Sequence, residues 1–389
     1  MNTYFADFHI HIGRTKTGKP VKISGAKSLT LSNLIHDASE VKGLNMIGVI
    51  DAHVPEVMEE MRELVAEGKV EAQADGGLRF KNVTVMLGSE IEIYDESCSG
   101  PFHVLVYFPD LDTMKQFSDW LSGHMKNITL SSQRYYGTGR RLQEKTEQLG
   151  GLFVVAHAFT PHKGLYGSGV VKSLVEVLDP DRIDAIELGL SADSGMADHL
   201  SELHRYPYLS NSDAHSLAKM AREYETLNLK APTFAEWRMA LRKEEGREIT
   251  ANYGLNPRLG KYHRTMCNHC FEIIEDDNGS ECPFCGFRRI TKGVADRLAE
   301  IADHTGVTNE RPPYIYQIPL EFIPKLGPKT LERLRQRFKT DMAILHEASE
   351  VELQEIVSGE MADAIIKARH GKLAVRSGGA GRYGKVDRS

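Results

Sequence analysis

The sequence of 389 residues contains no apolar run near the roughly 20 residues that a membrane-spanning helix requires. The first seven residues also lack the basic-then-apolar order of a signal peptide. Positive charge is not in excess, because 48 Lys and Arg face 54 Asp and Glu, which gives a net charge of -6. This balance excludes a uniformly basic nucleic-acid-binding protein but allows a local basic surface. We expect a globular protein of the cytoplasm with no membrane partner.

Cysteine is scarce, and its placement is informative. Cys98 stands alone, whereas the other four cysteines form two Cys-x-x-Cys pairs, Cys267 with Cys270 and Cys282 with Cys285. In a reducing compartment this pattern favours metal over disulfides. Four thiolates fill a tetrahedral site, so we predict one structural Zn, which would supply the folding energy that a segment of about 30 residues cannot gain from a core. A redox pair or two disulfides are the alternatives, and Cys98 is interpreted as an ordinary thiol.

The first 255 residues alternate between short apolar runs and amphipathic segments. This alternation predicts a parallel sheet, and seven units over roughly 250 residues favour a barrel over an open sheet. The predicted strands are residues 4–10, 46–50, 83–91, 103–108, 153–156, 185–188 and 208–210. The predicted helices are residues 31–42, 55–67, 111–125, 140–149, 172–178 and 196–204.

Composition divides the chain into four parts. Residues 1–255 form the predicted α/β barrel, a distorted one with about seven strands, and residues 256–291 form the four-cysteine zinc-binding module, a small zinc ribbon. Residues 292–375 are predicted to be a helical domain, with helices at 292–304 and within 318–368. Residues 376–389 are rich in glycine, so we expect a flexible tail.

Metal-ligand side chains mark the ends of six predicted strands. Because the carboxyl ends of parallel strands share one face, we expect these side chains to meet there. The predicted metal ligands are His9, His11, Asp51, Glu90, His103, His157, Asp213 and His215. His103 departs from the rule, because it opens its strand instead of ending it.

This ligand set exceeds what one ion needs, so it predicts two or three divalent ions, with Zn, Mn, Mg or Fe as candidates. Paired ions can generate hydroxide and hold both oxygens of a phosphoryl displacement. We expect Asp213 and His215 to act in catalysis as well. Asp51 and His53 compete for one ligand role, in which Asp51 is preferred, and Asp7 is expected to orient an imidazole. Each histidine taken singly could instead be an ordinary hydrogen-bonded residue.

A glycine-containing turn in the helical part predicts a contact with DNA. The run from Phe322 to Leu331 resembles a helix-hairpin-helix turn, in which Gly327 permits the bend and backbone N–H groups hold a phosphate. Lys325, Lys329 and Arg333 add positive charge for a contact that is independent of base sequence. The alternative is a plain helical hairpin with solvated cations.

Several motifs together resemble the PHP (polymerase and histidinol phosphatase) superfamily. They are Asp7-Phe8-His9-Ile10-His11, Gly88-Ser89-Glu90, His103, His157 and Ser212-Asp213-Ala214-His215. The resemblance implies a distorted seven-stranded β/α barrel that holds three metals for phosphoester hydrolysis, over about residues 1–255. One departure leaves a ligand open, since many members have Thr-Asp-His where this chain has Ile50-Asp51-Ala52-His53.

The order of parts over nearly the whole length is similar to the endonuclease Q family. This resemblance implies a DNA repair endonuclease that cuts 5′ to deaminated bases (uracil, hypoxanthine, xanthine) and abasic sites, in a nucleoid-associated location. The expected partner is single- or double-stranded DNA, with a replication sliding clamp as a further candidate, and the expected state is a monomer. Two alternatives stay open: a phosphatase or phosphodiesterase of a small phosphate ester, and a nucleic-acid-binding protein with an inactive barrel.

Overall fold

The computed structural model describes residues 1–275, 281–306 and 310–386. Residues 276–280 of the predicted zinc-binding module, 307–309 of the predicted helical domain and 387–389 of the predicted tail lie outside the described residues. Within the described residues, no helix is both long enough and apolar enough to cross a bilayer.

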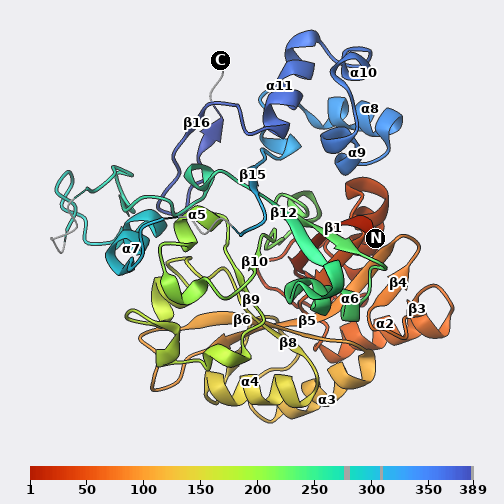
Figure 1. Cartoon of the computed structure of the whole chain (residues 1–389), viewed down its shortest axis with the longest axis vertical. Coiled ribbons are helices and arrows are strands. Elements are labelled where there is room, and N and C mark those ends of the chain that lie inside the picture. The colour runs from red at the N-terminus through yellow and green to blue at the C-terminus, as the bar shows by residue number, and fades with distance from the viewer. Residues whose placement is uncertain (276–280, 307–309, 387–389) are drawn as a thin grey trace.

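A curled sheet of thirteen strands forms the body of the molecule (Figure 1). Its strands lie in the order β10-β9-β8-β6-β5-β2-β1-β11-β12-β15, with β3, β4 and β7 attached at the side. The strands are β1 Asn2–Ile10, β2 Met46–Val49, β3 Glu71–Ala72, β4 Leu78–Phe80, β5 Val83–Ile93, β6 Phe102–Phe108, β7 Arg134–Tyr135, β8 Leu152–Val155, β9 Ala185–Glu187, β10 Tyr208–Leu209, β11 Tyr224–Leu229, β12 Glu248–Gly254 and β15 Tyr314–Tyr316. All seven predicted strands are present, and the fold is the predicted distorted α/β barrel.

The prediction of a parallel sheet holds for the pairs β1–β2, β2–β5, β8–β9 and β9–β10 and is wrong for other pairs. β6 runs antiparallel to both of its neighbours, β5 and β8, and β11 runs antiparallel to β1 and β12. Of these antiparallel pairs, only β5–β6 is joined by a short loop, residues 94–101, because antiparallel neighbours need no crossover, whereas helices lie between β6 and β8 and between β11 and β12 along the chain. The antiparallel direction of β6 also explains why His103 can lie with the other ligand-type side chains although it opens its strand. The first residues of β6 lie beside the last residues of β5, where His103 pairs with Glu92.

The inner face of the sheet changes from apolar to polar along the strands. Alternate residues of a strand share a face, so Met86 and Glu90 of β5 point to the same side. Met86 belongs to a buried cluster that includes Phe8, Tyr107 and Trp237, whereas Glu90 lies beyond that cluster at one end. The same face of β6 carries Tyr107, Leu105 and then His103, and that of β9 carries Ala185 and then Glu187. One end of the barrel interior is therefore lined by ligand-type side chains.

Glycine permits one close approach of two strands beside this end. A Cβ atom added at Gly48 of β2 would lie 2.0 Å from the carbonyl oxygen of Phe8 in β1. The register of these two strands shifts between Asp7 and Ile10, so β1 bends where its histidines begin.

Helices cover the outside of the sheet, with α3 and α4 at the bottom of Figure 1. The helices are α1 Leu31–His36, α2 Pro55–Ala66, α3 Leu111–Ser122, α4 Gly139–Gln148, α5 Ser194–Ala197, α6 Phe234–Leu241, α7 Val294–Ile301, α8 Pro328–Phe338, α9 Asp341–His346, α10 Glu350–Gln354 and α11 Gly359–Arg369. The helices predicted at residues 172–178 and 196–204 are much shorter in the structure. The first is a 3₁₀ turn at Leu174–Glu176 whose start is capped by Ser173, and the second divides into α5, capped by Asp193, and a 3₁₀ turn at Ser201–Leu203. The region that contains β11 and β12 was not predicted as strand, since polar residues interrupt both.

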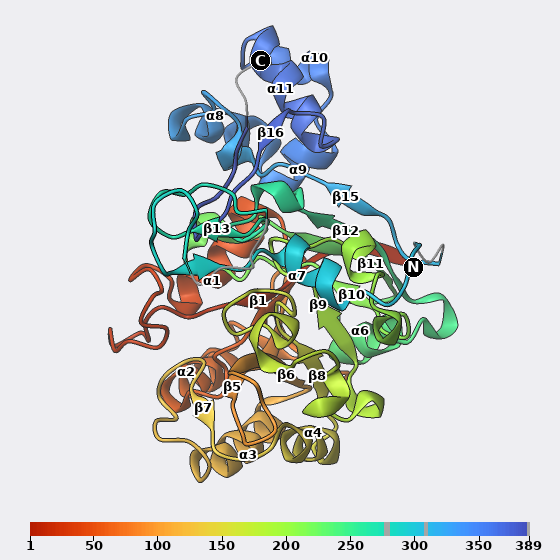
Figure 2. The same cartoon turned by 90° about the vertical axis from the view of Figure 1, so that its left-hand side faces the viewer.

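The C-terminal third lies over one end of the barrel (Figure 2). Helices α8 to α11 pack as a group, and β15 joins the main sheet beside β12. The Cys-rich segment contains the strand pair β13 (Met266–Cys267) and β14 (Ile290–Thr291). The described part of the predicted flexible tail follows a defined path, in which β16 (Val375–Arg376) and β17 (Lys385–Val386) form a hairpin. Backbone hydrogen bonds from Gly378 and Gly384 to residues 258 and 259 hold this hairpin to the barrel, and composition gave no sign of them.

Candidate metal centre and its pocket

Seven of the eight predicted metal ligands meet at the polar end of the barrel. They form three overlapping groups, within each of which the ligand atoms lie no more than 4.8 Å apart. The groups are His9, His11 and Glu90; His11, Asp213 and His215; and Glu90, His103 and His157.

Two carboxylates link the histidines of the cluster. Oε1 of Glu90 lies 3.5 Å from Nε2 of His9, 2.9 Å from Nδ1 of His103 and 3.3 Å from Nε2 of His157. Oδ1 of Asp213 lies 3.5 Å from Nε2 of His9 and 3.3 Å from Nε2 of His215. Each carboxylate therefore serves several imidazoles, an arrangement suited to bridging neighbouring cations.

The histidine nitrogens that face the cluster show most clearly that it suits a cation. Nε2 of His9 and Nε2 of His11 are buried and have no hydrogen-bond partner. Burying a polar atom without a partner is costly, and neutral imidazole nitrogen is a preferred ligand of Zn, Mn and Fe. The donor set thus fits divalent metal ions.

Groups behind the cluster fix the orientation of these imidazoles. Glu187 accepts hydrogen bonds from Nδ1 of His9 at 3.0 Å and from the backbone N–H of His157 at 2.7 Å. Because Nδ1 of His9 donates to Glu187, Nε2 is the atom that a neutral His9 ring offers to a metal ion in the cluster. Glu187 was not predicted as a site residue. The sequence feature that could have identified it is a carboxylate at the end of a short, otherwise apolar strand.

The structure does not place Asp51 among the ligand atoms. Oδ2 of Asp51 accepts from the backbone N–H of Ile12 at 2.7 Å and lies 3.2 Å from Nδ1 of His11, so Asp51 stands behind that histidine. His53 lies farther from the centre, with its Nδ1 2.8 Å from the hydroxyl of Ser89. Neither Asp51 nor His53, the two candidates for the eighth ligand, belongs to the three groups of ligand atoms.

Neighbouring charges keep the carboxylates of the cluster ionised. Burial raises the pKa of the Glu90 carboxyl, but His103 and Lys22 outweigh it and hold that pKa well below its usual range. Burial likewise opposes ionisation of Asp213, and His9 outweighs it with the same result. Burial lowers the pKa of His9, but Glu187 and Asp213 overcome it and raise that pKa well above its usual value. Ionised carboxylates that stabilise positive charge on an imidazole also favour a bound cation.

Three residues at or beside this centre have a strained backbone. His157, Asp213 and Ala221 have positive φ angles of 27°, 45° and 57°, which residues with a side chain rarely adopt. Asp7 holds the loop that contains two of them: its Oδ1 accepts from the N–H of Ser212 at 3.0 Å and its Oδ2 from that of Ala221 at 2.9 Å. Asp7 therefore fixes the backbone of the Asp213 loop, and touches His9 only through a long backbone contact of 3.4 Å.

A cavity of about 420 Å³ opens beside the cluster. Its walls include Glu90, His103, His157, Asp213 and His215 together with cationic and aromatic side chains from five segments of the chain. The latter are Lys22, Lys163, Lys219, Arg222, Lys261, Tyr262 and Tyr383. A negatively charged substrate that enters this cavity meets both the ligand cluster and positive charge.

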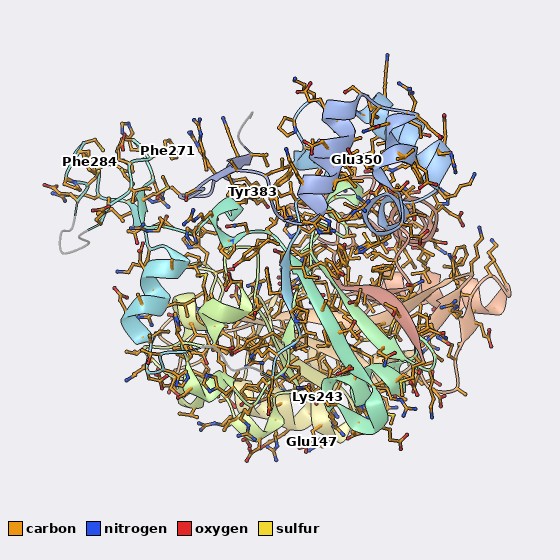
Figure 3. The ribbon with its side chains drawn as sticks, turned by 45° about the horizontal axis from the view of Figure 1, so that its top comes forward. Glu147, Lys243, Phe271, Phe284, Glu350 and Tyr383 are labelled. Atoms are coloured by element: carbon orange, nitrogen blue, oxygen red, sulfur yellow. The ribbon has the colours of Figure 1, made fainter. Side chains whose placement is uncertain are left out.

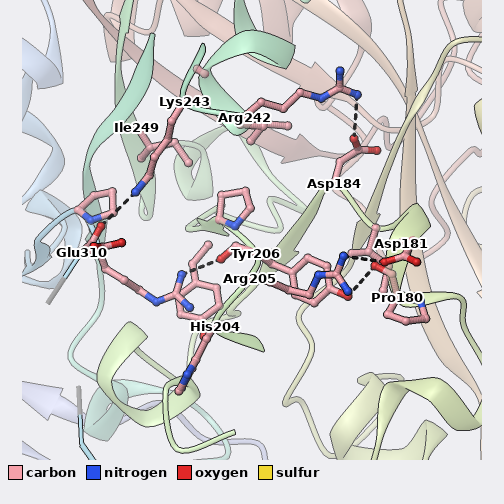
Figure 4. Close-up of a pocket in the computed structure, with 17 residues that line it drawn as sticks. Pro180, Asp181, Asp184, His204, Arg205, Tyr206, Arg242, Lys243, Ile249 and Glu310 are labelled. Atoms are coloured by element: carbon pink, nitrogen blue, oxygen red, sulfur yellow. Dashed lines mark hydrogen bonds and ion pairs between the residues drawn. The ribbon is translucent and has the colours of Figure 1, made fainter. Parts of the chain in front are cut away.

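A hollow of about 940 Å³, larger than the cavity beside the cluster, lies elsewhere, between β10, α6 and the segment around Glu310 (Figure 4). Its arginines are paired with carboxylates: Arg205 lies 2.6 Å from Asp181, Arg242 lies 3.8 Å from Asp184, and Arg311 lies 2.6 Å from Asp198. None of its lining residues belongs to the candidate metal-binding groups found among the described residues. Size alone therefore does not mark the reaction site.

The four cysteines of the two Cys-x-x-Cys pairs come together at the Cys-rich segment. The Sγ atoms of Cys267 and Cys285 lie 3.6 Å apart, as do those of Cys270 and Cys282. Disulfides would need about 2.05 Å, whereas four thiolates at roughly 2.3 Å from a tetrahedral Zn would lie about 3.8 Å apart. Burial acts against ionisation of Cys267, but N–H groups of residues 269 and 270 outweigh it and lower its pKa to about 6. This geometry suits Zn.

The predicted DNA-contacting residues lie on the surface of the helical part. Gly327 caps α8, and the space beside its Cα is open. Lys325 forms an exposed ion pair with Glu360 at 3.0 Å, and Arg333 donates to the carbonyl of Ile356 at 2.6 Å. Lys329 is exposed. A short 3₁₀ turn, and not a full helix, precedes the glycine, so only half of the helix-hairpin-helix pattern is regular.

No family model matches the chain. The uncharacterized protein YqxK of Bacillus subtilis is 54% identical over 386 residues, which cover 99% of this chain and 100% of that protein. The structure of the lesion-specific endonuclease PfuEndoQ from Pyrococcus furiosus is similar with a TM-score of 0.86 and 32% identity, over 99% of this chain and 95% of that one. A complex of Endonuclease Q with a 27-mer duplex that has an abasic lesion at the active site gives a TM-score of 0.85 and 32% identity, over 100% and 97%.

Proposed function

Because the chain belongs to the endonuclease Q family, we propose that it is a metal-dependent DNA endonuclease that starts the repair of damaged bases. It hydrolyses the phosphodiester 5′ to deaminated bases (uracil, hypoxanthine, xanthine) or abasic sites. One observation carries the proposal: a chain that matches a lesion-specific endonuclease over 99% of its length gathers seven metal-ligand side chains at the end of its barrel.

We propose that His9, His11, Glu90, His103, His157, Asp213 and His215 hold two or three divalent ions. When bound, such ions supply an activated water and stabilise negative charge on the phosphate. Glu187 and Asp51 keep His9 and His11 oriented for this role through their Nδ1 atoms. Lys22, which donates to Glu90 at 3.1 Å, balances part of the negative charge.

The positively charged wall of the cavity then receives the DNA strand. The damaged nucleotide leaves the base stack before the cut, and a deaminated or missing base is cheaper to extrude than a paired one. In-line attack leaves a 3′-hydroxyl and a 5′-phosphate. Gly327, Lys325, Lys329 and Arg333 are proposed to hold the duplex backbone outside the cavity, and the four cysteines to hold one structural Zn. The sliding clamp, the monomeric state and the cytoplasmic location stay predictions.

The test uses labelled duplexes that each contain one modified base, incubated with and without added divalent metal. We expect nicking of the uracil, hypoxanthine, xanthine and abasic duplexes only, and only with metal. Asp213→Asn should abolish nicking while binding of the uracil duplex persists. Retained cleavage would remove Asp213 from the centre, and turnover of a small phosphate ester without any nicking would overturn the proposal.

A further inference from the structure

One buried cation of the cavity has only uncharged hydrogen-bond partners. Arg222 is 8% exposed, and it donates to the carbonyl oxygens of Ser212 at 2.7 Å and Asp213 at 3.2 Å and to the hydroxyl of Tyr383. No ion pair among the described residues includes Arg222. The nearby acid Glu223 does not compensate it at neutral pH, because burial raises the pKa of Glu223 to about 8. A buried charge without a counter-ion is costly, so this position favours an incoming anion.

A second cation of the cavity is also uncompensated. The ammonium of Lys261 lies 4.6 Å from the ring centroid of Tyr383 and forms no ion pair within the described part of the chain. Burial and the positive charge of Arg222 and Lys219 lower the pKa of Lys261, against the opposite effect of Asp213. Lys219 itself is neutralised by Glu321 at 2.7 Å.

The hollow of Figure 4 provides the contrast, since its buried guanidinium is neutralised. Arg311 stacks on Tyr208 and lies 2.6 Å from Asp198. Arg205 and Arg242 also have carboxylate partners there. Uncompensated positive charge is therefore a property of the wall beside the metal centre and not of every hollow in this protein.

The C-terminal hairpin builds this wall from a segment far away in the sequence. Tyr383 lies in the turn between β16 and β17, above the barrel and between the Cys-rich segment and the helices (Figure 3). The N–H of Gly381 donates to the carbonyl of Lys261 at 3.1 Å, and Arg382 stacks on Phe271 of the Cys-rich segment at 3.4 Å. The ring of Tyr383 is thereby held among the cations, 5.7 Å from the guanidinium of Arg222.

We propose that Arg222 and Lys261, arranged around Tyr383, form a phosphate-binding subsite that holds one phosphate of the DNA strand beside the metal centre. The proposal rests on the proposed endonuclease function. A guanidinium has five N–H donors, of which three are used on neutral acceptors here, so two remain for phosphate oxygens. Lys261 adds a point charge, and Tyr383 is a positioning residue that keeps both cations in place.

The first test removes the charge of Lys261 in a pair of proteins that share the same Asp213 loop. Binding of a uracil duplex is measured over a range of salt concentrations in Asp213→Asn protein, with and without Lys261→Gln. We expect Lys261→Gln to weaken binding about tenfold and to reduce the slope of log K against log salt by about 1. The matched control is Lys115→Gln, which removes the same charge from α3 at the outside of the barrel and should change neither quantity.

The second test locates the phosphate. Duplexes in which one linkage at a time is an uncharged methylphosphonate are bound to the same proteins. A methylphosphonate at one linkage should weaken binding to the protein that retains Lys261. The same duplex should bind the Lys261→Gln variant as well as the unmodified duplex does. Tyr383→Phe, which keeps the ring, should retain most of the affinity that Tyr383→Ala loses. An equal effect at every linkage, or an unchanged affinity and slope in Lys261→Gln, would overturn the subsite.

Melting temperatures measured with inorganic phosphate distinguish failure of the subsite from failure of the endonuclease proposal on which it rests. If phosphate raises the melting temperature of the full-length protein but not of Lys261→Gln, and the protein neither binds nor nicks DNA, the subsite stands with a small phosphate as its ligand and the endonuclease proposal fails. If the protein nicks damaged DNA while Lys261→Gln binds and cuts it unchanged, the endonuclease proposal stands and the subsite fails.

Discussion

The Asp213 loop depends on one buried carboxylate, so Asp7→Asn is the most informative single substitution. Both oxygens of Asp7 accept backbone N–H groups, from Ser212 at 3.0 Å and from Ala221 at 2.9 Å. These two donors bracket the strained residue Asp213 and lie at both ends of the loop that carries His215. Asparagine has nearly the same size, but one of its two terminal atoms is a donor.

The size of the effect follows from the hydrogen bonds. Whichever way the introduced amide turns, one buried N–H group faces another donor and loses its acceptor, which costs about 1–3 kcal/mol. The remaining bond loses the assistance of a full charge, which costs about 1 kcal/mol more. We therefore expect Asp7→Asn to lower the free energy of unfolding by roughly 2–4 kcal/mol and, because the loop positions Asp213 and His215, to weaken metal binding at the barrel about 10- to 100-fold.

Two measurements check this expectation. Urea unfolding of metal-free protein is followed by tryptophan fluorescence, because both tryptophans lie in the barrel and Trp237 stacks on Phe8, the neighbour of Asp7, at 4.0 Å. Metal affinity is measured by titration of the same protein. Asp119→Asn, at an exposed position of α3, is the control and should change neither value. Wild-type stability together with wild-type metal affinity in Asp7→Asn would refute the argument that Asp7 organises the loop.

Three further substitutions test other parts of the structure. Cys282→Ser should reduce the metal content by one ion and leave the barrel ions in place, as measured by elemental analysis, whereas Cys98→Ser should change nothing. Glu187→Gln should weaken metal binding about 10- to 100-fold, since it removes the charged acceptor behind His9; an unchanged metal titration would contradict this role. Glu223→Gln should stabilise metal-free protein increasingly as pH rises from about 5 to 8. The reason is that folding raises the pKa of Glu223 to about 8, so the folded state holds a proton that the unfolded state releases, and stability falls across that window by roughly 4 kcal/mol. Denaturation midpoints of both proteins at pH 5 and pH 8 measure this difference, and a constant gap would disprove it.

The strands and the gathering of most of the candidate ligand side chains could be predicted because both depend on local pattern. Short apolar runs that end in His, Asp or Glu give the position of each side chain along its strand and its face, as for His9, Glu90 and His157. Strand direction is not local, and His103 fits only once β6 is known to run antiparallel to β5. Asp51 follows its strand in the same way as His157 does, yet the turn after β2 carries it behind His11.

The residues around the metal centre could not be predicted, since their roles arise from contacts between distant segments. Glu187 is separated from His9 by 178 positions, and Tyr383 from Arg222 by 161. No periodicity relates such pairs, and a glycine-rich tail resembles a disordered segment until its N–H groups find acceptors on the barrel.

The position of Tyr383 changes how the parts of the chain should be separated in experiments. Removal of everything after about residue 260 would be the obvious way to ask whether the barrel alone is an enzyme. The same cut would remove Lys261, Tyr262 and Tyr383 from the wall of the cavity, so loss of activity would follow even if the Cys-rich segment and the helices never touched a substrate. Point substitutions on the surface of the helical part, such as Lys329→Gln, leave the cavity intact and are therefore the sounder measure of what that part contributes to DNA binding.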